Sequence, residues 1–310
     1  MKRIISFSLA FTFFVALGYF GMAITHSQGK SDQAPGALHD LNVGAPSQRP
    51  GFAPTVGGTA ATTPITNHGG PVMTGTIHVY LIWYGNWNQA NGTDTPAGQQ
   101  LVRDFVSNIG GSPHFNINTS YPGVTGAVTY SGQTTDTGTS TRLSDTNIRT
   151  IVSNAISSGR LPNDSSGLYF VLTSSNINKT GFCSQYCGWH TYATLSGSNI
   201  KYSFVGNAAR CITSCAAQST SPNGNAGVDG MLSVLAHELE EAATDPNLNA
   251  WYDASGAENA DKCAWTFGHF QYQVANGSWA NMHLGTRDYL IQRNLLHGTS
   301  DFCMVDATHN

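Results

Sequence analysis

The order of apolar and polar positions divides most of the chain into alternating strands and helices. From Thr76 to Tyr84, β-branched and aromatic residues follow one another with only His78 interrupting them, which predicts a buried strand. The shorter runs "GAVTYSG", "GLYFVLTS" and "IKYSFVGN" predict three more strands. Four strands are therefore expected in the first two thirds of the chain.

Two segments between these strands carry apolar residues at helical spacing. In "PAGQQLVRDFVSNIGG" the apolar positions recur three and four residues apart, and glycines end the pattern. "SDTNIRTIVSNAISSG" predicts a second helix, with Ser144 or Asp145 as its N-cap. After Trp251 the pattern weakens into short strands and loops. This order predicts one domain of the α+β class, or of the α/β class, with a mixed sheet.

The clearest helical pattern is "GVDGMLSVLAHELEEAATDP", which predicts a helix from near Asp229 to just before Pro246. His237 lies two residues, or about 200° around the helix axis, from Leu235. It therefore points away from the apolar stripe of the helix. That stripe consists of Met231, Leu232, Leu235, Leu239 and Ala242.

The N-terminal residues have the layout of a secretory signal peptide. Lys2 and Arg3 precede an apolar stretch that ends in small residues, which predicts a signal peptide over residues 1–23. About 20 apolar residues could also span a bilayer as an uncleaved anchor, and both readings place the rest of the chain outside the cytoplasm. Residues 24–66 are rich in Pro, Gly, Ser and Thr, which predicts a disordered leader or linker.

These segments leave residues 67–310 as the expected globular domain. We expect the mature protein to be secreted and extracellular, with the periplasm or the cell surface as alternatives, and to have no stable membrane span. The formal net charge is only −4 and no basic stripe is present, which argues against nucleic acid as a partner.

Six cysteines agree with export, because an even number in an exported chain predicts disulfides. The two C-x-x-x-C pairs predict local bridges, Cys183–Cys187 and Cys211–Cys215. Cys263 and Cys303 are then left to form a long staple. The alternative for the two local pairs is a thiolate metal site.

The helix at 229–245 also carries an H-E-x-x-E motif, although charged residues make up only 10% of the chain. His237 and Glu241 are four residues apart on one helix face, so both can reach a single ion. Glu238 flanks that face and could take a proton from a metal-bound water, as the glutamate of H-E-x-x-H does in zinc peptidases. Zinc is the expected ion, and the oxygen ligands also make calcium or manganese competitive.

A further ligand has to come from outside this helix. Glu258 and Asp261 in "GAENADKC" are candidates, and His190 in "CGWH" is another. The alternative is a solvated, acidic helix end without metal. Against that alternative, Glu240 and Glu241 lie in the last turns, where the helix dipole disfavours anions by about 0.3–1 kcal/mol. A nearby cation would reverse this penalty.

Several blocks together resemble the phosphate-induced protein 1 family, also called Exordium-like proteins. The blocks are "HGGPVMTGTIHVYLIWYGNW", "VLTSSNI", "GFCSQYCGWH", "SFVGNAARCITSC" and "PNGNAGVDGMLSVLAHELEEAATDPNLNAWYD". Plant members of this family are extracellular proteins associated with growth and the cell wall, so the resemblance implies secretion. It carries the helix motif onto His237, Glu238 and Glu241, and E-x-A-D-x-C onto Glu258, Asp261 and Cys263. The likeness to zincin metallopeptidases is confined to the H-E-x-x-E helix.

Two functions follow as hypotheses. The first is a secreted zincin-like metallohydrolase that acts on a peptide or a cell-wall-associated substrate, with Glu238 as catalytic base and His237, Glu241, Glu258 and Asp261 as candidate metal ligands. The second is a non-catalytic extracellular cell-wall or growth-signalling protein with a structural metal or none. Catalytic zinc sites keep one coordination position open and structural sites fill it, so the number of converging protein ligands discriminates between them.

Overall fold

The domain is built around a five-stranded sheet with the strand order β3-β2-β5-β8-β7. The structure is a computed structural model, and it describes residues 63–307. Strands β3, β2, β5 and β8 are parallel, and the edge strand β7 is antiparallel to β8. The sheet is therefore mixed, as predicted. The strand bounds are Gly75–Tyr84 (β2), Val124–Asp136 (β3), Gly167–Thr173 (β5), Gly188–Leu195 (β7) and Ser198–Gly206 (β8).

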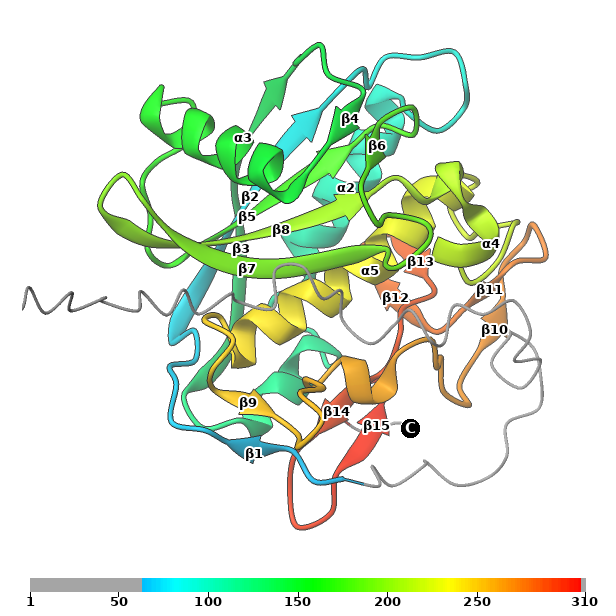
Figure 1. Ribbon diagram of the computed structural model, residues 1–310. Helices are drawn as coiled ribbons and strands as arrows, with labels where there is room; N and C mark the ends of the chain where they lie inside the picture. Colours follow the sequence, from blue (N-terminus) through cyan, green and yellow to red (C-terminus); the bar gives the residue numbers. More distant parts are fainter. Residues whose placement is uncertain (1–62, 308–310) are drawn as a thin grey trace, which may run out of the picture.

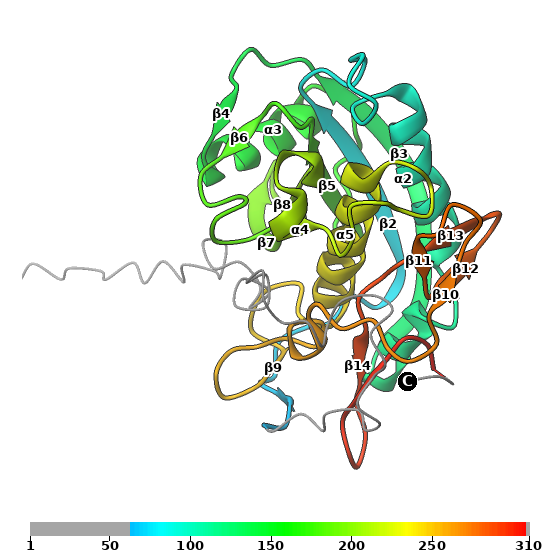
Figure 2. The same ribbon diagram turned by 90° about the vertical axis from the view of Figure 1, so that its right-hand side faces the viewer.

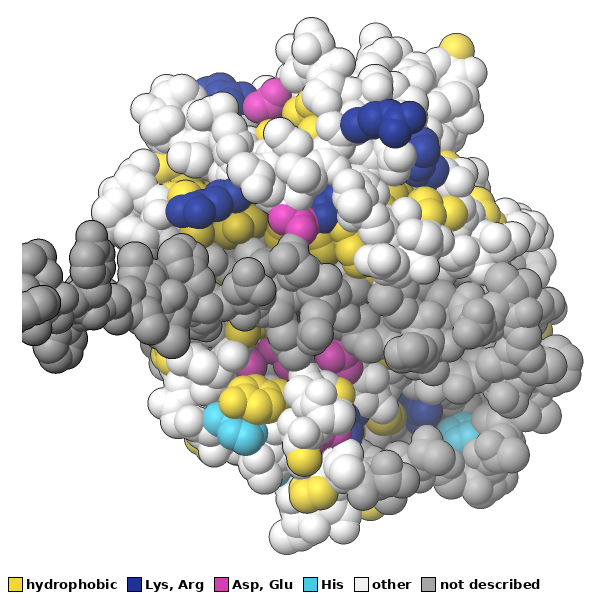
Figure 3. Space-filling model, viewed as in Figure 1, with side chains coloured by type: hydrophobic (Ala, Val, Ile, Leu, Met, Phe, Trp, Pro, Cys, Tyr) yellow, Lys and Arg dark blue, Asp and Glu magenta, His cyan; other side chains and the backbone are white. Residues whose placement is uncertain are grey.

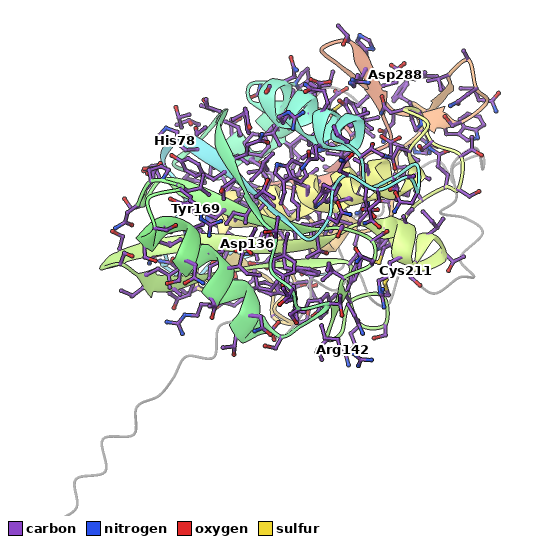
Figure 4. The ribbon with its side chains drawn as sticks, turned by 90° about the horizontal axis from the view of Figure 1, so that it is seen from above. His78, Asp136, Arg142, Tyr169, Cys211 and Asp288 are labelled. Atoms are coloured by element: carbon purple, nitrogen blue, oxygen red, sulfur yellow. A yellow bond between two sulfur atoms is a disulfide. The ribbon has the colours of Figure 1, made fainter. Side chains whose placement is uncertain are left out.

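Helices cover both faces of this sheet (Figures 1 and 2). Helices α2 and α5 contact each other on one face, and α3 contacts β5 and β8 on the other. Seen from above, α3 lies across the strands (Figure 4). The chain passes from β2 through α2 to β3, then crosses β2 through α3 to reach β5. The helix bounds are Pro96–Ile109 (α2), Asp145–Ser157 (α3), Ile212–Cys215 (α4) and Ala226–Thr244 (α5).

The predicted strands and helices are present, with shifted ends. Ser144 is the N-cap of α3, where its side chain and that of Asn147 form a capping box. Every residue of β5 is buried, because a central parallel strand is covered by helices on both faces. Strand β7 was not predicted. Its sequence "GWHTYATL" mixes aromatic and polar residues, and only its place beside β8 makes it a strand.

Helix α5 begins earlier than predicted and is buried on all sides. Its N-cap is Asn225, whose side chain accepts a hydrogen bond from the backbone N–H of Val228. Asp229 lies inside the first turn and accepts hydrogen bonds from Asn223 instead. The sheet covers one side of α5, and the C-terminal segments lie on the other side (Figure 2). Consequently the polar face of this helix is enclosed and does not face solvent.

The C-terminal part consists of short strands and loops, as predicted, and β14 and β15 lie below α5 in Figure 1. Three two-stranded sheets lie in this part, β10–β11, β12–β13 and β14–β15, and two more, β1–β9 and β4–β6, include strands from earlier in the chain. Their strands are Thr66–Asn67 (β1), Arg142–Leu143 (β4), Asn178–Lys179 (β6), Trp251–Tyr252 (β9), Tyr272–Gln273 (β10), Trp279–Ala280 (β11), Met282–Leu284 (β12), Arg287–Tyr289 (β13), Asn294–Leu296 (β14) and Phe302–Met304 (β15). The 3-10 helices are Phe115–Ser120 (η3), Ala208–Arg210 (η4) and Asp261–Cys263 (η5).

The disulfide connectivity corrects the sequence prediction at two of three bridges. Cys263–Cys303 is present, but the other bridges are Cys183–Cys211 and Cys187–Cys215, so the predicted Cys183–Cys187 and Cys211–Cys215 bridges are wrong. Cys211 and Cys215 are four residues apart at α4, a spacing that lets both side chains reach the segment that carries Cys183 and Cys187. Both sulfurs therefore face the neighbouring segment. All six cysteines are bridged, which excludes the thiolate metal site.

The predicted signal peptide and most of the predicted leader lie outside the described residues. Ile65 is buried and Thr66 pairs with Tyr252, so the described fold includes residues that we expected in the leader. Within residues 63–307, no helix has the length and apolar character needed to cross a bilayer.

Candidate metal centre

The H-E-x-x-E motif of α5 brings His237 and Glu241 together, as its spacing predicts. Nε2 of His237 lies 3.1 Å from Oε1 of Glu241 and 3.6 Å from Oδ1 of Asp261. Asp261 opens the 3-10 helix η5, and its backbone N–H donates to Oε1 of Glu241 over 3.1 Å. One histidine and two carboxylates from two segments thus form a first group of three ligand atoms within 4.8 Å of one another.

A second group of three ligand atoms lies on the other side of Glu241. Nδ1 of His190 is 3.6 Å from Oε2 of Glu238 and 3.5 Å from Oε2 of Glu241. His190 belongs to the edge strand β7, which packs against α5. The two groups share Glu241, which presents one carboxylate oxygen to each histidine. Glu238, the predicted catalytic base, therefore lies among the candidate ligands.

Glu258 occupies a different place from Asp261. Its Oε1 lies 3.7 Å from Nε2 of His190, and that ring nitrogen is also 3.3 Å from the backbone oxygen of Asp245. The structure therefore places Asp261, and not Glu258, next to His237. A carboxylate on the second ring nitrogen is the common way in which a metal-binding histidine is oriented. A backbone carbonyl serves equally, and here the oxygen of Asp245 is the nearer partner of this nitrogen, with the Glu258 carboxylate beside it.

The distances within the two groups fit a shared cation better than direct hydrogen bonds. Three of the four separations between a histidine nitrogen and a carboxylate oxygen are 3.5–3.6 Å and exceed a normal N–H···O bond, whereas His237 and Glu241 are 3.1 Å apart. Two atoms bound to one tetrahedral zinc at about 2.0–2.1 Å lie roughly 3.3 Å apart. Among the described residues, Nδ1 of His237 and both carboxylate oxygens of Glu238 are buried without a hydrogen-bond partner. Such atoms are costly to bury unless something binds them.

The electrostatics of the cluster also favour added positive charge. Burial opposes the charged form of both histidines, yet the carboxylates raise their pKa values well above the usual range: Glu258 first for His190, and Glu241 first for His237. The electrostatic potential at these histidines is therefore strongly negative. A divalent cation would occupy the position that this field favours.

The pKa values of the two glutamates of the motif are shifted in opposite directions. Burial raises the pKa of Glu238 to about 7, against the weaker attraction of the nearby histidines. Burial also opposes the charge of Glu241, but the attraction of His237 and His190 outweighs it and lowers the pKa of this group. Glu241 is thus the ionised carboxylate at the centre of the cluster, between the two imidazoles.

The bound species that fits this donor set is a borderline or hard divalent cation. Imidazole nitrogen and carboxylate oxygen are ligands of zinc and of manganese, and the surplus of oxygen also admits calcium. The side chains are nearly inaccessible: those of His190 and His237 are 2% exposed and that of Glu241 is 0% exposed. Protein groups therefore enclose the space between the ligand atoms.

Glu240 of α5 forms a buried pair with His114 that the sequence does not predict. Oε1 of Glu240 lies 2.6 Å from Nε2 of His114, and both side chains are 2% exposed. His114 precedes η3, far from α5 in the chain, and no motif marks it. Glu240 and Glu241 are adjacent in sequence but point into different buried surroundings. Only Glu241 belongs to the candidate metal centre.

On the face of the molecule shown in Figure 3, Lys and Arg side chains form separate groups and no continuous basic surface, and acidic side chains appear near the middle. Together, fold and cluster define a disulfide-bonded α+β domain with a buried histidine–carboxylate centre.

Residues 65–289 match the conserved region of the phosphate-induced protein 1 family, so this chain belongs to that family. It is 34% identical to the Arabidopsis thaliana protein EXORDIUM-like 3 over 273 residues, which cover 73% of this chain and 78% of the relative. It is 30% identical to EXORDIUM-like 5 from the same plant over 239 residues, 65% and 64% of the two chains. Protein EXORDIUM of that plant is 28% identical over 240 residues, 66% and 74% of the two chains. No solved structure matches the chain.

Proposed function

We propose that this protein is a non-catalytic extracellular member of the Exordium-like family, of the cell-wall or growth-signalling kind, whose core is held together by a buried structural metal. Membership of the family supports the first part. The three disulfides support export, because such bonds persist in oxidising compartments.

The observation that carries the metal assignment is the convergence of protein ligands. His237, Glu241 and Asp261 form one group, and His190 and Glu238 complete a second group with Glu241. Structural sites fill their coordination positions with protein atoms, whereas catalytic sites leave one for water or substrate. In this cluster Glu238 lies 3.6 Å from His190 and belongs to the second group of ligand atoms, so the residue that a peptidase would need as a free base is itself a candidate ligand.

An ion held there would join three parts of the fold. His190 lies on β7, Glu238 and Glu241 lie on α5, and Asp261 lies on η5. When bound, the cation would supply positive charge to a set of buried carboxylates. The protein side chains themselves fix the position of the edge strand and of the segment after β9 against the central helix. Zinc is the first candidate, followed by manganese and calcium.

Metal analysis of the purified, mature protein tests this proposal. We expect at least one equivalent of zinc, manganese or calcium in the wild-type protein, and a large loss in His237→Ala. His283→Ala is the matched control, because the side chain of His283 is 64% exposed and pairs with Asp288, away from the cluster. Equal metal content in wild type, His237→Ala and His283→Ala would refute the metal centre.

The pairing of His237 with Glu241 one helical turn away, with Glu238 beside them in the motif, supports a second candidate, a secreted metallopeptidase. In that case Glu238 would take a proton from water as it attacks a peptide carbonyl, and would pass it to the leaving amine. The test is a peptide library with wild type and Glu238→Gln. Cleavage by the wild type that Glu238→Gln abolishes while keeping its metal would favour the peptidase. The structural proposal predicts that neither protein cleaves any peptide.

A further inference from the structure

A second feature of the molecule, independent of the metal centre, is a cavity at the carboxyl ends of the parallel strands. It has a volume of about 560 Å³, within the range of small-molecule sites. Strands β2, β3 and β5 end in register, because Tyr84 pairs with both Asp136 and Thr173. The loops that follow these three ends form the walls of the cavity. No residue of the metal centre lines it.

This is the place where open sheets with helices on both faces bind ligands. The chain leaves β2 toward β3 on one side and returns to β5 on the other, so the strand order reverses at β2. Loops after strands on either side of such a reversal diverge to opposite faces and leave a crevice between them. Here the crevice receives one wall from the loop between Asp136 and Arg142, both labelled in Figure 4.

The cavity is lined by uncharged residues, both polar and apolar. Amides and hydroxyls predominate, and no Lys, Arg, His, Asp or Glu is present. Among the described residues, the side chains of Asn88, Gln99 and Thr137 make no hydrogen bond to the protein, although all three line the cavity. They are therefore available to a ligand that both donates and accepts hydrogen bonds.

The nearby helix start is poorly suited to an anion. Helix α2 begins at Pro96, which has no backbone N–H, and Thr95 already accepts the hydrogen bond of Gly98. Two of the donors that usually attract phosphate at a helix N-terminus are thus absent or occupied. Without a cationic side chain in the walls, a phosphorylated or carboxylated ligand would find little to neutralise it.

A buried tryptophan borders the cavity. Trp87 lines the cavity and is only 5% exposed, and its indole N–H has no hydrogen-bond partner among the described residues. The ring is held against Trp83 in an edge-to-face arrangement, with centroids 4.9 Å apart. The ring therefore gives the cavity a rigid aromatic border, held in place by the packing of the two tryptophans.

We propose that this cavity binds a neutral saccharide of one or two sugar units. Sugar hydroxyls match the amide and hydroxyl groups of Asn88, Gln99 and Thr137. Pro96 and Ile177 supply apolar surface for the C–H groups of a sugar ring. The absence of charge in the lining selects neutral sugars over uronic acids and sugar phosphates.

The test is isothermal titration calorimetry of the full mature protein with glucose, galactose, xylose, cellobiose, galacturonic acid and glucose 6-phosphate. We expect at least one neutral sugar to bind in the millimolar range or tighter, and the two charged sugars to bind at least tenfold more weakly. Asn88→Ala combined with Gln99→Ala should weaken the neutral sugar at least tenfold, and Thr137→Trp should block the cavity. Asn154→Ala, at an exposed position of α3, is the matched control and should bind like wild type.

Three outcomes would overturn the proposal. These are no binding of any neutral sugar, equal or tighter binding of a charged sugar, and unchanged binding in both cavity variants. Asn88 and Thr137 are exposed and make no side-chain hydrogen bond to the protein, so their variants are expected to fold. Loss of metal in His237→Ala should leave sugar binding in place, which separates this result from the test of the metal centre.

Discussion

His190 on β7 and Glu241 on α5 lie with Nδ1 and Oε2 3.5 Å apart, and this contact joins the edge of the sheet to the central helix. The other oxygen of Glu241 faces His237, one helical turn away. Glu241 is therefore the residue on which both groups of candidate ligands depend.

Glu241→Gln should remove more metal than any other single change in the cluster. The substitution removes the negative charge of the side chain that contributes one oxygen to each of the two groups of ligand atoms. We expect the metal content, measured by plasma mass spectrometry, to fall by at least tenfold. Glu240→Gln is a close control, because it is equally buried but faces His114. Equal metal loss in the two variants would show that a general disturbance of α5, and not the loss of a ligand, is responsible.

Removing the metal should lower the thermal stability of the wild-type protein. A ligand at about a hundred times its Kd stabilises the native state by about 2.7 kcal/mol. For a domain of this size, that corresponds to roughly 5–10 °C in Tm. Differential scanning calorimetry with and without EDTA measures the shift. His237→Ala should already unfold at the lower temperature and should not respond to EDTA; an equal response in both proteins would contradict the prediction.

The crossed disulfides predict a specific peptide map. Proteolysis without reduction should release one disulfide-linked product that joins the segment around residues 183–187 to the segment around 211–215. Removal of Cys187–Cys215 by a double Ala substitution should lower the free energy of unfolding by about 2–4 kcal/mol. Mass spectrometry of the digest identifies the linkage. Two separate products, each with an internal bridge, would contradict the crossed pairing and support Cys183–Cys187 and Cys211–Cys215 instead.

Asp253 should make the stability of the protein depend on pH in the acid range. Burial opposes its charge, but the ion pair with Lys262 and hydrogen bonds from Thr63 and Ala257 outweigh it and lower its pKa. An acid with a lowered folded-state pKa contributes stability above its unfolded pKa, about 3.9, and loses it as the pH falls toward the folded value. Asp253→Asn should therefore lower Tm at pH 7, and the difference from wild type should shrink below about pH 4. A difference that stays constant with pH would exclude this origin.

Gly188 should not tolerate a larger side chain. A Cβ there would lie 2.6 Å from Cγ1 of Val234 and 2.9 Å from Oε1 of Glu238, because β7 approaches α5 closely at this point. Gly188→Ala should cost about 1–3 kcal/mol of stability and also reduce metal content by displacing Glu238. Chemical denaturation measures the first effect. Gly298→Ala is the control for added volume, because the nearest atom to its Cβ would be the backbone oxygen of Ser300 at 3.7 Å, an ordinary contact.

The fold could be predicted in proportion to how local its signals are. The buried run of β2, the spacing of α2 and the cap of α3 each lie within a few residues, and all three elements are present. Strand β7 was missed because its sequence carries no alternation, and its conformation depends on hydrogen bonds to β8. Two disulfides were assigned to the wrong partners for the same reason, since sequence proximity was the only available guide.

For the candidate site, the sequence by itself determined that His237 and Glu241 share one helix face, because helical periodicity fixes the directions of side chains four residues apart. It also determined membership of the family and the short list of outside ligands. Only the tertiary structure decided which distant groups lie together: Asp261 lies beside His237, Glu258 beside His190, and Glu240 beside His114. Those choices depend on how distant segments pack around one buried helix, and no local pattern encodes such contacts.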